Sequence, residues 1–101
     1  MIAPLQPVAQ DQLDALCRRW PVRELALFGS AARGEARPDS DIDVLVSFEP
    51  EAGWSLLELV DMQDELAALF GREVDLVEEA ALRNPVRRRA ILRDKRILHA
   101  A

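Results

Sequence analysis

Two aspartates separated by one residue are the first feature of the sequence that indicates chemistry. Asp41 and Asp43 stand where an apolar run begins, and ten residues separate Asp41 from Gly29 and Ser30, a pair that predicts a turn. Side chains two apart on a strand share a face, with Cα atoms roughly 6 to 7 Å apart, so two carboxylates placed there repel each other. Mg²⁺ relieves such repulsion and is usually held by one or two carboxylates together with substrate phosphates. The pair therefore predicts a metal beside a phosphate ligand.

A third aspartate, Asp75, interrupts the apolar stretch VDLV, where burial favours a hydrophobic side chain. If its strand lies beside the strand that carries Asp43, Asp75 completes a three-carboxylate cluster able to bind metal and to accept a proton from an attacking hydroxyl. Taken alone, an acid in a short strand often faces solvent, and Ser-Asp at a strand start is common turn chemistry. The combined spacing favours a site for nucleotidyl transfer.

The glycine-serine turn would supply the phosphate side of this site. Gly29 lets the backbone approach a ligand closely, and the Ser30 hydroxyl and nearby amides can donate to phosphate oxygens. Arg33 and Arg37 are candidates for a supporting role near the phosphates, and Ser40 is a further candidate for nucleotide binding. Metal and amides together would neutralise a pyrophosphate leaving group.

The elements that must position these residues can be read from the apolar pattern. Helical spacing, β-branched runs and Gly, Pro or Asn boundaries predict alternating helices and strands. The helices are expected over residues 8–20, 30–33, 55–70 and 85–98, and the strands over 24–28, 42–48 and 73–78. This order indicates an α/β (α+β) fold in which helices pack on a small mixed sheet of three to four strands.

Length and composition limit the alternatives. The chain of 101 residues is half apolar, so residues 1–101 are expected to form a single domain. The lone Cys17 has no internal disulfide partner, and no segment resembles a membrane span, which favours a cytoplasmic setting without a membrane partner. The net charge is -5, yet residues 83–96 hold seven basic residues and one acid. The acidic remainder disfavours duplex nucleic acid as a partner.

The motif residues resemble those of the minimal nucleotidyltransferases of the DNA polymerase β superfamily, the small antitoxins paired with HEPN toxins. The family pattern GSxARGxxxxxSDxDLxV matches GSAARGEARPDSDIDVLV, which begins at Gly29, almost throughout. The family's third carboxylate falls on Asp75. The similarity covers nearly the whole chain, and the spacing is specific.

This resemblance implies the nucleotidyltransferase fold and a division of roles. Asp41, Asp43 and Asp75 are expected to be the catalytic and metal-binding residues, with two Mg²⁺ ions, and Gly29 and Ser30 to hold the triphosphate. The implied reaction transfers AMP from ATP to a hydroxyl, a tyrosine in related systems, of a partner HEPN toxin, and so silences its RNase activity. A homo- or hetero-oligomer fits this role.

Two other functions stay open at this stage. The domain could neutralise its partner by binding alone, with an inactive nucleotide site, or it could modify a small molecule such as an antibiotic. The second is disfavoured because no substrate domain is evident.

Several residues have two interpretations. A group of arginines could dock an acidic partner or nucleotide phosphates, although a solvated helix face is favoured. The group comprises Arg87, Arg88, Arg89, Arg93 and Arg96. Trp54 could anchor a partner or pack in the core. Cys17 is interpreted as a packing residue, and His99 is assigned no role.

Overall fold

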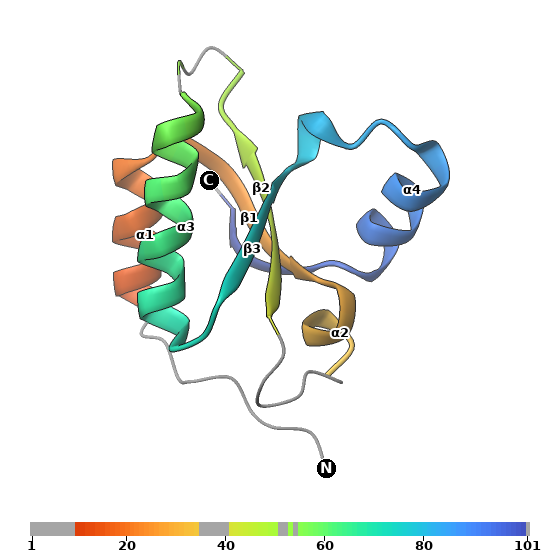
Figure 1. Ribbon diagram of the computed structural model, residues 1–101, viewed down its shortest axis with the longest axis horizontal. Coiled ribbons are helices and arrows are strands. Elements are labelled where there is room, and N and C mark those ends of the chain that lie inside the picture. Colours follow the sequence, from red (N-terminus) through yellow and green to blue (C-terminus); the bar gives the residue numbers. More distant parts are fainter. Residues whose placement is uncertain (1–9, 35–40, 51–52, 54, 101) are drawn as a thin grey trace.

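A mixed sheet of four strands, in the order β3-β2-β1-β4, organises the chain (Figure 1). The computed structural model describes residues 10–34, 41–50, 53 and 55–100. The central strands β1 (Val22–Phe28) and β2 (Ile42–Phe48) are antiparallel. Strand β3 (Val74–Glu78) runs parallel to β2, and β4 (Arg96–Ala100) runs antiparallel to β1. The predicted α/β fold with a small mixed sheet is therefore confirmed.

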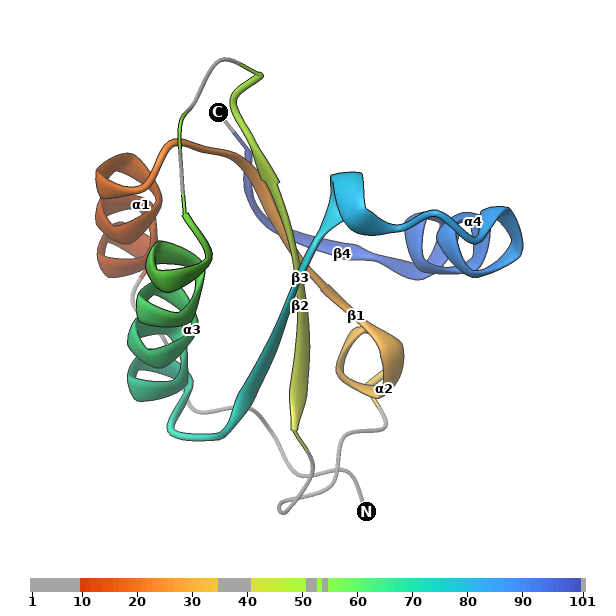
Figure 2. The same cartoon turned by 45° about the horizontal axis from the view of Figure 1, so that its top comes forward.

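Helices α1 (Gln10–Arg19) and α3 (Leu56–Phe70) cover one face of the sheet (Figures 1 and 2). Ser55 caps α3 by accepting a hydrogen bond from the Glu58 amide, and Gly71 ends the helix with φ of 68°, a left-handed conformation that glycine adopts easily. The apolar sides of both helices pack on alternate residues of the strands to form the main core. Its fully buried members include Leu25, Ile42, Val44, Val46, Met62 and Leu66.

The opposite face of the sheet is only partly covered, by α2 (Gly29–Ala32), a short 3-10 helix (Glu79–Ala81) and α4 (Pro85–Asp94) (Figure 2). The Asn84 side chain caps α4 by accepting from the amides of Val86 and Arg87, and Pro85 occupies the first turn. A smaller core of Phe28, Leu45, Leu82 and Ile91 holds α4 against this face. The sheet therefore has one closed face and one open face, and α4 stands beside the open part.

The predicted C-terminal helix to residue 98 is wrong beyond Asp94. The helix ends there, and residues 96–100 form the edge strand β4. Pairing with β1 satisfies backbone groups that would otherwise remain unpaired at the edge of the sheet. Two contacts with α1 reinforce this placement: Gln10 Nε2 donates to the Leu98 carbonyl at 3.0 Å, and His99 Nδ1 lies 2.7 Å from Asp14 Oδ1. Tertiary pairing therefore decides the conformation of this segment.

The other elements agree closely with the sequence-based ranges. Strand β1 begins two residues earlier than expected, α2 already includes Gly29, and β3 begins one residue later. Helix α1 begins at Gln10 in the part of the chain that is described, and residues 8 and 9 lie outside that part. In the part of the chain that the structure describes, no helix is long and apolar enough to cross a bilayer.

Candidate active site

Asp43 and Asp75 lie next to each other on the open face of the sheet. The parallel pairing of β2 and β3 places Asp43 opposite Asp75. Their sequence neighbours Ile42, Val44 and Val74 belong to the core beneath the helices, so strand alternation turns both aspartates to the opposite side. The prediction that the strand of Asp75 lies beside that of Asp43 is confirmed.

Asp41 precedes β2 directly and is exposed. Its negative charge lies close enough to act on Asp43. Burial is the main cause that raises the pKa of Asp43, followed by the charges of Asp75 and Asp41. Arg87 opposes this shift. Three negative charges therefore interact at one end of the sheet.

The expectation that Asp75 sits in a buried environment is wrong. Val74 and Leu76 on either side are buried, whereas Asp75 itself is exposed. Val74 and Leu76 belong to the main core on the closed face of the sheet. Asp75 is consequently available to a ligand without the desolvation cost that burial would impose.

Gly29 links the glycine-serine turn to the carboxylates. Phe28, the last residue of β1, pairs with Asp43, so Gly29 follows directly beside that aspartate. Its φ is 65°, and a Cβ added there would lie 2.6 Å from Asp43 Oδ2. Any side chain at position 29 would have to displace the carboxylate. The glycine is therefore required both by its backbone conformation and by the closeness of Asp43.

The remaining predicted nucleotide-binding residues are only partly placed. Ser30 lies half-buried in α2, directly after Gly29, and Arg33 is exposed at the C-terminal end of that helix. Ser40, Arg37 and Trp54 lie outside the described residues. Their assignments stay predictions.

The donor set suits a hard divalent cation, because it consists of carboxylate oxygens on exposed or half-buried aspartates. Burial is the main cause of the raised pKa of Asp43, and a cation would offset the second cause, which is repulsion from Asp75 and Asp41. Among the described residues, however, no three His, Cys, Asp or Glu side chains are already grouped so that they could hold a metal ion. The roles of Asp41, Asp43 and Asp75 as metal ligands therefore stay predictions.

Polar contacts at the edges of the sheet hold the carboxylate-bearing strands in place. The Ile42 amide donates to the Glu73 carbonyl at 2.9 Å, and Gln63 Oε1 of α3 accepts from the Leu76 amide at 3.0 Å. Gln63 gave no signal in the sequence, because its role depends on how α3 packs beside β3. These bonds fix the backbone on both sides of Asp75.

A recess of about 470 Å³ lies at the other end of the same sheet face, away from the aspartates. Lys95 pairs with Glu24 across it at 2.5 Å, and Arg88 pairs with Glu79 at 3.3 Å. Glu79 also accepts a hydrogen bond from Ser47. These contacts attach α4 and the 3-10 helix to the strands, so they position α4 relative to the carboxylates. The sequence gave no indication of them.

The structure also shows the contacts of Cys17 and His99. Cys17 is buried in the core, and burial raises the pKa of its thiol to about 11. It is therefore not an activated nucleophile, as predicted. His99 joins β4 to α1 through Asp14, a structural contact that the sequence did not predict.

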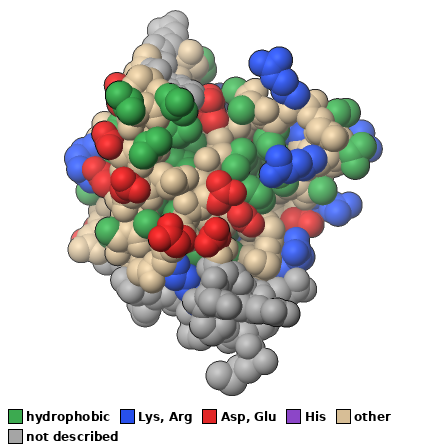
Figure 3. Space-filling view, in the orientation of Figure 1, with side chains coloured by type: hydrophobic (Ala, Val, Ile, Leu, Met, Phe, Trp, Pro, Cys, Tyr) green, Lys and Arg blue, Asp and Glu red, His purple; other side chains and the backbone are tan. Residues whose placement is uncertain are grey.

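Figure 3 shows how charge is distributed around the site. Acidic side chains gather over the centre of the face that it displays, and basic side chains lie beside them over α4. This arrangement provides carboxylates for a cation and nearby cations for an anionic ligand. A metal-bound polyphosphate combines both requirements, which is the arrangement expected of a nucleotidyltransferase.

Comparison with known proteins agrees with this class. A model of the nucleotidyltransferase domain family matches residues 10–98. Over 71 residues, the chain is 45% identical to the protein adenylyltransferase MntA of Thermococcus cleftensis, and the match covers 70% of each protein. The chain therefore belongs to the nucleotidyltransferase domain family and is a nucleotidyltransferase, as predicted.

Solved structures support the fold. A protein provisionally named a minimal nucleotidyltransferase superimposes with a TM-score of 0.73 at 40% identity, covering 86% of both chains. This chain also superimposes on a chain of a complex described as tri-AMPylated Shewanella oneidensis HEPN toxin with MNT antitoxin. That match has a TM-score of 0.63 at 19% identity and covers 91% of this chain and 70% of the other. At this identity, the second comparison supports the fold alone.

Proposed function

We propose that this protein transfers AMP from ATP to a hydroxyl group of a partner HEPN toxin and thereby neutralises the toxin. The relative MntA is named a protein adenylyltransferase, and the Shewanella complex contains an AMP-modified HEPN toxin beside an antitoxin of the same fold. The observation that carries the proposal is the pairing of Asp43 with Asp75 on the open sheet face, with Gly29 against the Asp43 carboxylate. A tyrosine is the proposed acceptor.

In this proposal Asp41, Asp43 and Asp75 hold Mg²⁺, with two ions as the expected number. A bound divalent cation would supply charge stabilisation for the phosphoryl oxygens and the leaving group. Asp41 and Asp43 would hold it from the start of β2, and Asp75 would hold it from β3. Carboxylates from two strands would thus bind the same cation.

The chain's own groups then orient the reactants. Gly29 allows the triphosphate to approach the backbone, and the Ser30 hydroxyl donates to its oxygens. The acceptor oxygen attacks the α-phosphorus, its proton passes to the exposed Asp75 carboxylate, and pyrophosphate departs as the bond to the α-phosphate breaks. The product is a phosphodiester that joins AMP to the toxin.

The proposal is tested by incubating the protein with Mg²⁺, a candidate HEPN partner and ATP that is radiolabelled at the α-phosphate. We expect label in the toxin with the wild-type protein and none with Asp41→Asn or Asp43→Asn. Asp64→Asn is the matched control, because Asp64 is exposed on α3, on the other side of the sheet. Undiminished label with both site variants would refute the catalytic role of the pair.

The same variants separate catalysis from binding. Toxin neutralisation in cells should be lost together with label transfer if AMP transfer is the mechanism. Rescue that persists in Asp43→Asn, when label transfer is gone, would show that neutralisation occurs by binding alone.

A further inference from the structure

Arg87 occupies an unusual position on α4. It precedes the buried Ile91 by four residues, so both lie on the helix stripe that faces the sheet. Ile91 packs with Phe28 and Leu45 in the smaller core, whereas Arg87, one turn earlier, is exposed. An apolar residue at position 87 would extend this core toward the start of the helix. The chain has a positively charged arginine at this position instead.

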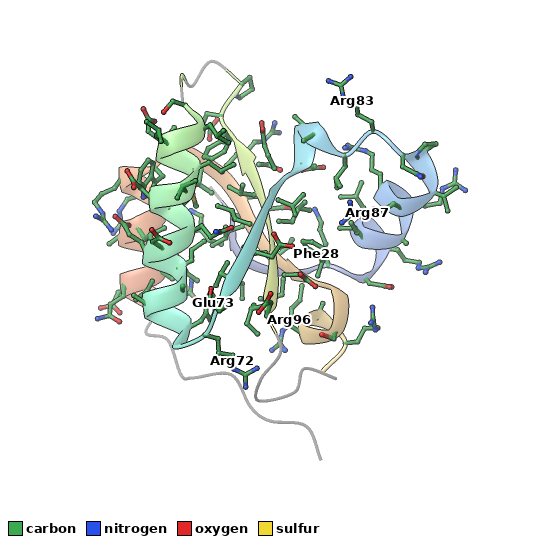
Figure 4. All side chains as sticks on the ribbon, in the orientation of Figure 1. Phe28, Arg72, Glu73, Arg83, Arg87 and Arg96 are labelled. Carbon is green, nitrogen blue, oxygen red and sulfur yellow. The ribbon has the colours of Figure 1, made fainter. Side chains whose placement is uncertain are left out.

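Arg87 also lies on the side of α4 that faces the strands. Figure 4 shows it between α4 and the strands, whereas Arg83, just before the helix, extends outward. Helix α4 also contacts α2, the helix that begins at Gly29 beside the Asp43 carboxylate. Arg87 therefore stands on a helix that adjoins the proposed triphosphate site.

No structural ion pair accounts for this arginine. Among the described residues, no acidic side chain lies within ion-pair distance of Arg87, unlike its neighbour Arg88, which pairs with Glu79. The Arg88 and Lys95 ion pairs and the capping of α4 by Asn84 fix the helix without it. Other residues therefore fix the position of α4, and the Arg87 guanidinium is available to a ligand.

We propose that Arg87 binds the polyphosphate of the nucleotide from the α4 side, opposite the carboxylates. This inference rests on the proposed function, since it assumes that ATP lies on the open sheet face. An arginine presents a planar set of donors that matches phosphate oxygens, and its charge is permanent at any working pH. Here it would offset charge on the departing pyrophosphate, so that α4 forms one wall of the nucleotide site.

Nucleotide affinity provides the test, measured by calorimetry with Mg²⁺ and the ATP analogue AMP-PNP in the absence of the toxin, so that no acceptor for AMP is present. Arg87→Gln should raise the Kd about tenfold or more, because a charge-assisted hydrogen bond is lost. Arg87→Lys should recover part of this loss. Arg89→Gln is the matched control, since Arg89 is exposed on the far side of the same helix and should leave the Kd within about twofold.

AMP and inorganic tripolyphosphate identify the group that Arg87 contacts. The substitution should weaken tripolyphosphate binding strongly and AMP binding little. Wild-type affinity for AMP-PNP in Arg87→Gln, or equal weakening in Arg87→Gln and Arg89→Gln, would overturn the inference while leaving the proposed function intact. Failure of the wild-type protein to bind AMP-PNP would overturn both.

Discussion

At the level of single residues, Asp43 shows how the site affects stability. Its pKa is raised, chiefly by burial and then by Asp75, so the folded protein disfavours the charged form relative to the unfolded chain. The stability associated with this group is fully present below its unfolded pKa and is lost as the pH rises through the folded pKa. At neutral pH, the ionised carboxylate therefore opposes folding in the absence of a metal.

Asp43→Asn should consequently raise the melting temperature of the metal-free protein at pH 7 while abolishing AMP transfer. The difference between variant and wild type should shrink at an acidic pH below the raised pKa of Asp43, because the wild-type carboxyl is then protonated. Thermal unfolding followed by circular dichroism at both pH values provides the measurement. A variant that melts below wild type at pH 7 would contradict this assignment of the charge.

Gly29 gives a second prediction at this scale. Gly29→Ala places a Cβ 2.6 Å from Asp43 Oδ2 in a left-handed conformation, so it should displace the carboxylate and reduce transfer sharply. The backbone penalty alone is about 1 to 2 kcal/mol of unfolding free energy. Gly53→Ala is the control, because nothing lies within 4 Å of the corresponding Cβ. Equal transfer activity in both variants would argue against the closeness of Gly29 and Asp43.

At the level of elements, the smaller core determines where α4 stands. Ile91 is buried between α4 and the sheet, and its loss should loosen the whole helix. Ile91→Ala should therefore lower the free energy of unfolding by about 2 to 5 kcal/mol, the usual range for such cavities. If Arg87 binds nucleotide from this helix, the variant should also bind AMP-PNP more weakly at a temperature where it remains folded.

Val86→Ala is the matched control for α4, because 77% of the Val86 side chain is exposed. Its effect should stay within about 0.5 kcal/mol in urea unfolding. Similar destabilisation by both substitutions would mean that Ile91 does not anchor the helix.

The elements also show what the sequence could and could not reveal. Helix α3 and strand β2 were predictable because local signals agree: Ser55 and Gly71 bound the helix, and β-branched residues fill the strand. Strand β4 was missed because the segment after Asp94 carries no glycine stop, and only the free edge of β1 makes it a strand. The same limitation applies to Gln63 and Lys95, whose partners come from distant parts of the chain.

The site was predictable in residue identity but not in environment. The number of residues between Gly29 and Asp43 could be read from the sequence. This spacing lets β2 return beside β1, so that Asp43 lies against Gly29. The exposure of Asp75 could not be inferred, because VDLV is compatible with burial on both faces or on one. The part played by α4 depends on which residues pack with Ile91, which the sequence alone does not specify.

At the level of the whole molecule, the basic side chains over α4 lie beside a group of acidic side chains (Figure 3). A metal-bound nucleotide would neutralise both groups of charge and bind only the folded protein. Mg²⁺ with AMP-PNP should therefore raise the melting temperature, by an amount equivalent to about 2.7 kcal/mol when free ligand is at 100 times its Kd. Asp43→Asn should show a much smaller shift. Equal shifts in both proteins would place the bound nucleotide elsewhere.

The most direct test of the account is the intact mass of the partner HEPN toxin after incubation with this protein, ATP and Mg²⁺. We predict that the toxin gains mass in whole AMP units with the wild-type protein and stays unmodified with Asp43→Asn or in the presence of a chelator. A toxin whose mass stays unchanged with the wild-type protein, or one that is modified equally by Asp43→Asn, would contradict AMP transfer by the aspartates of β2 and β3.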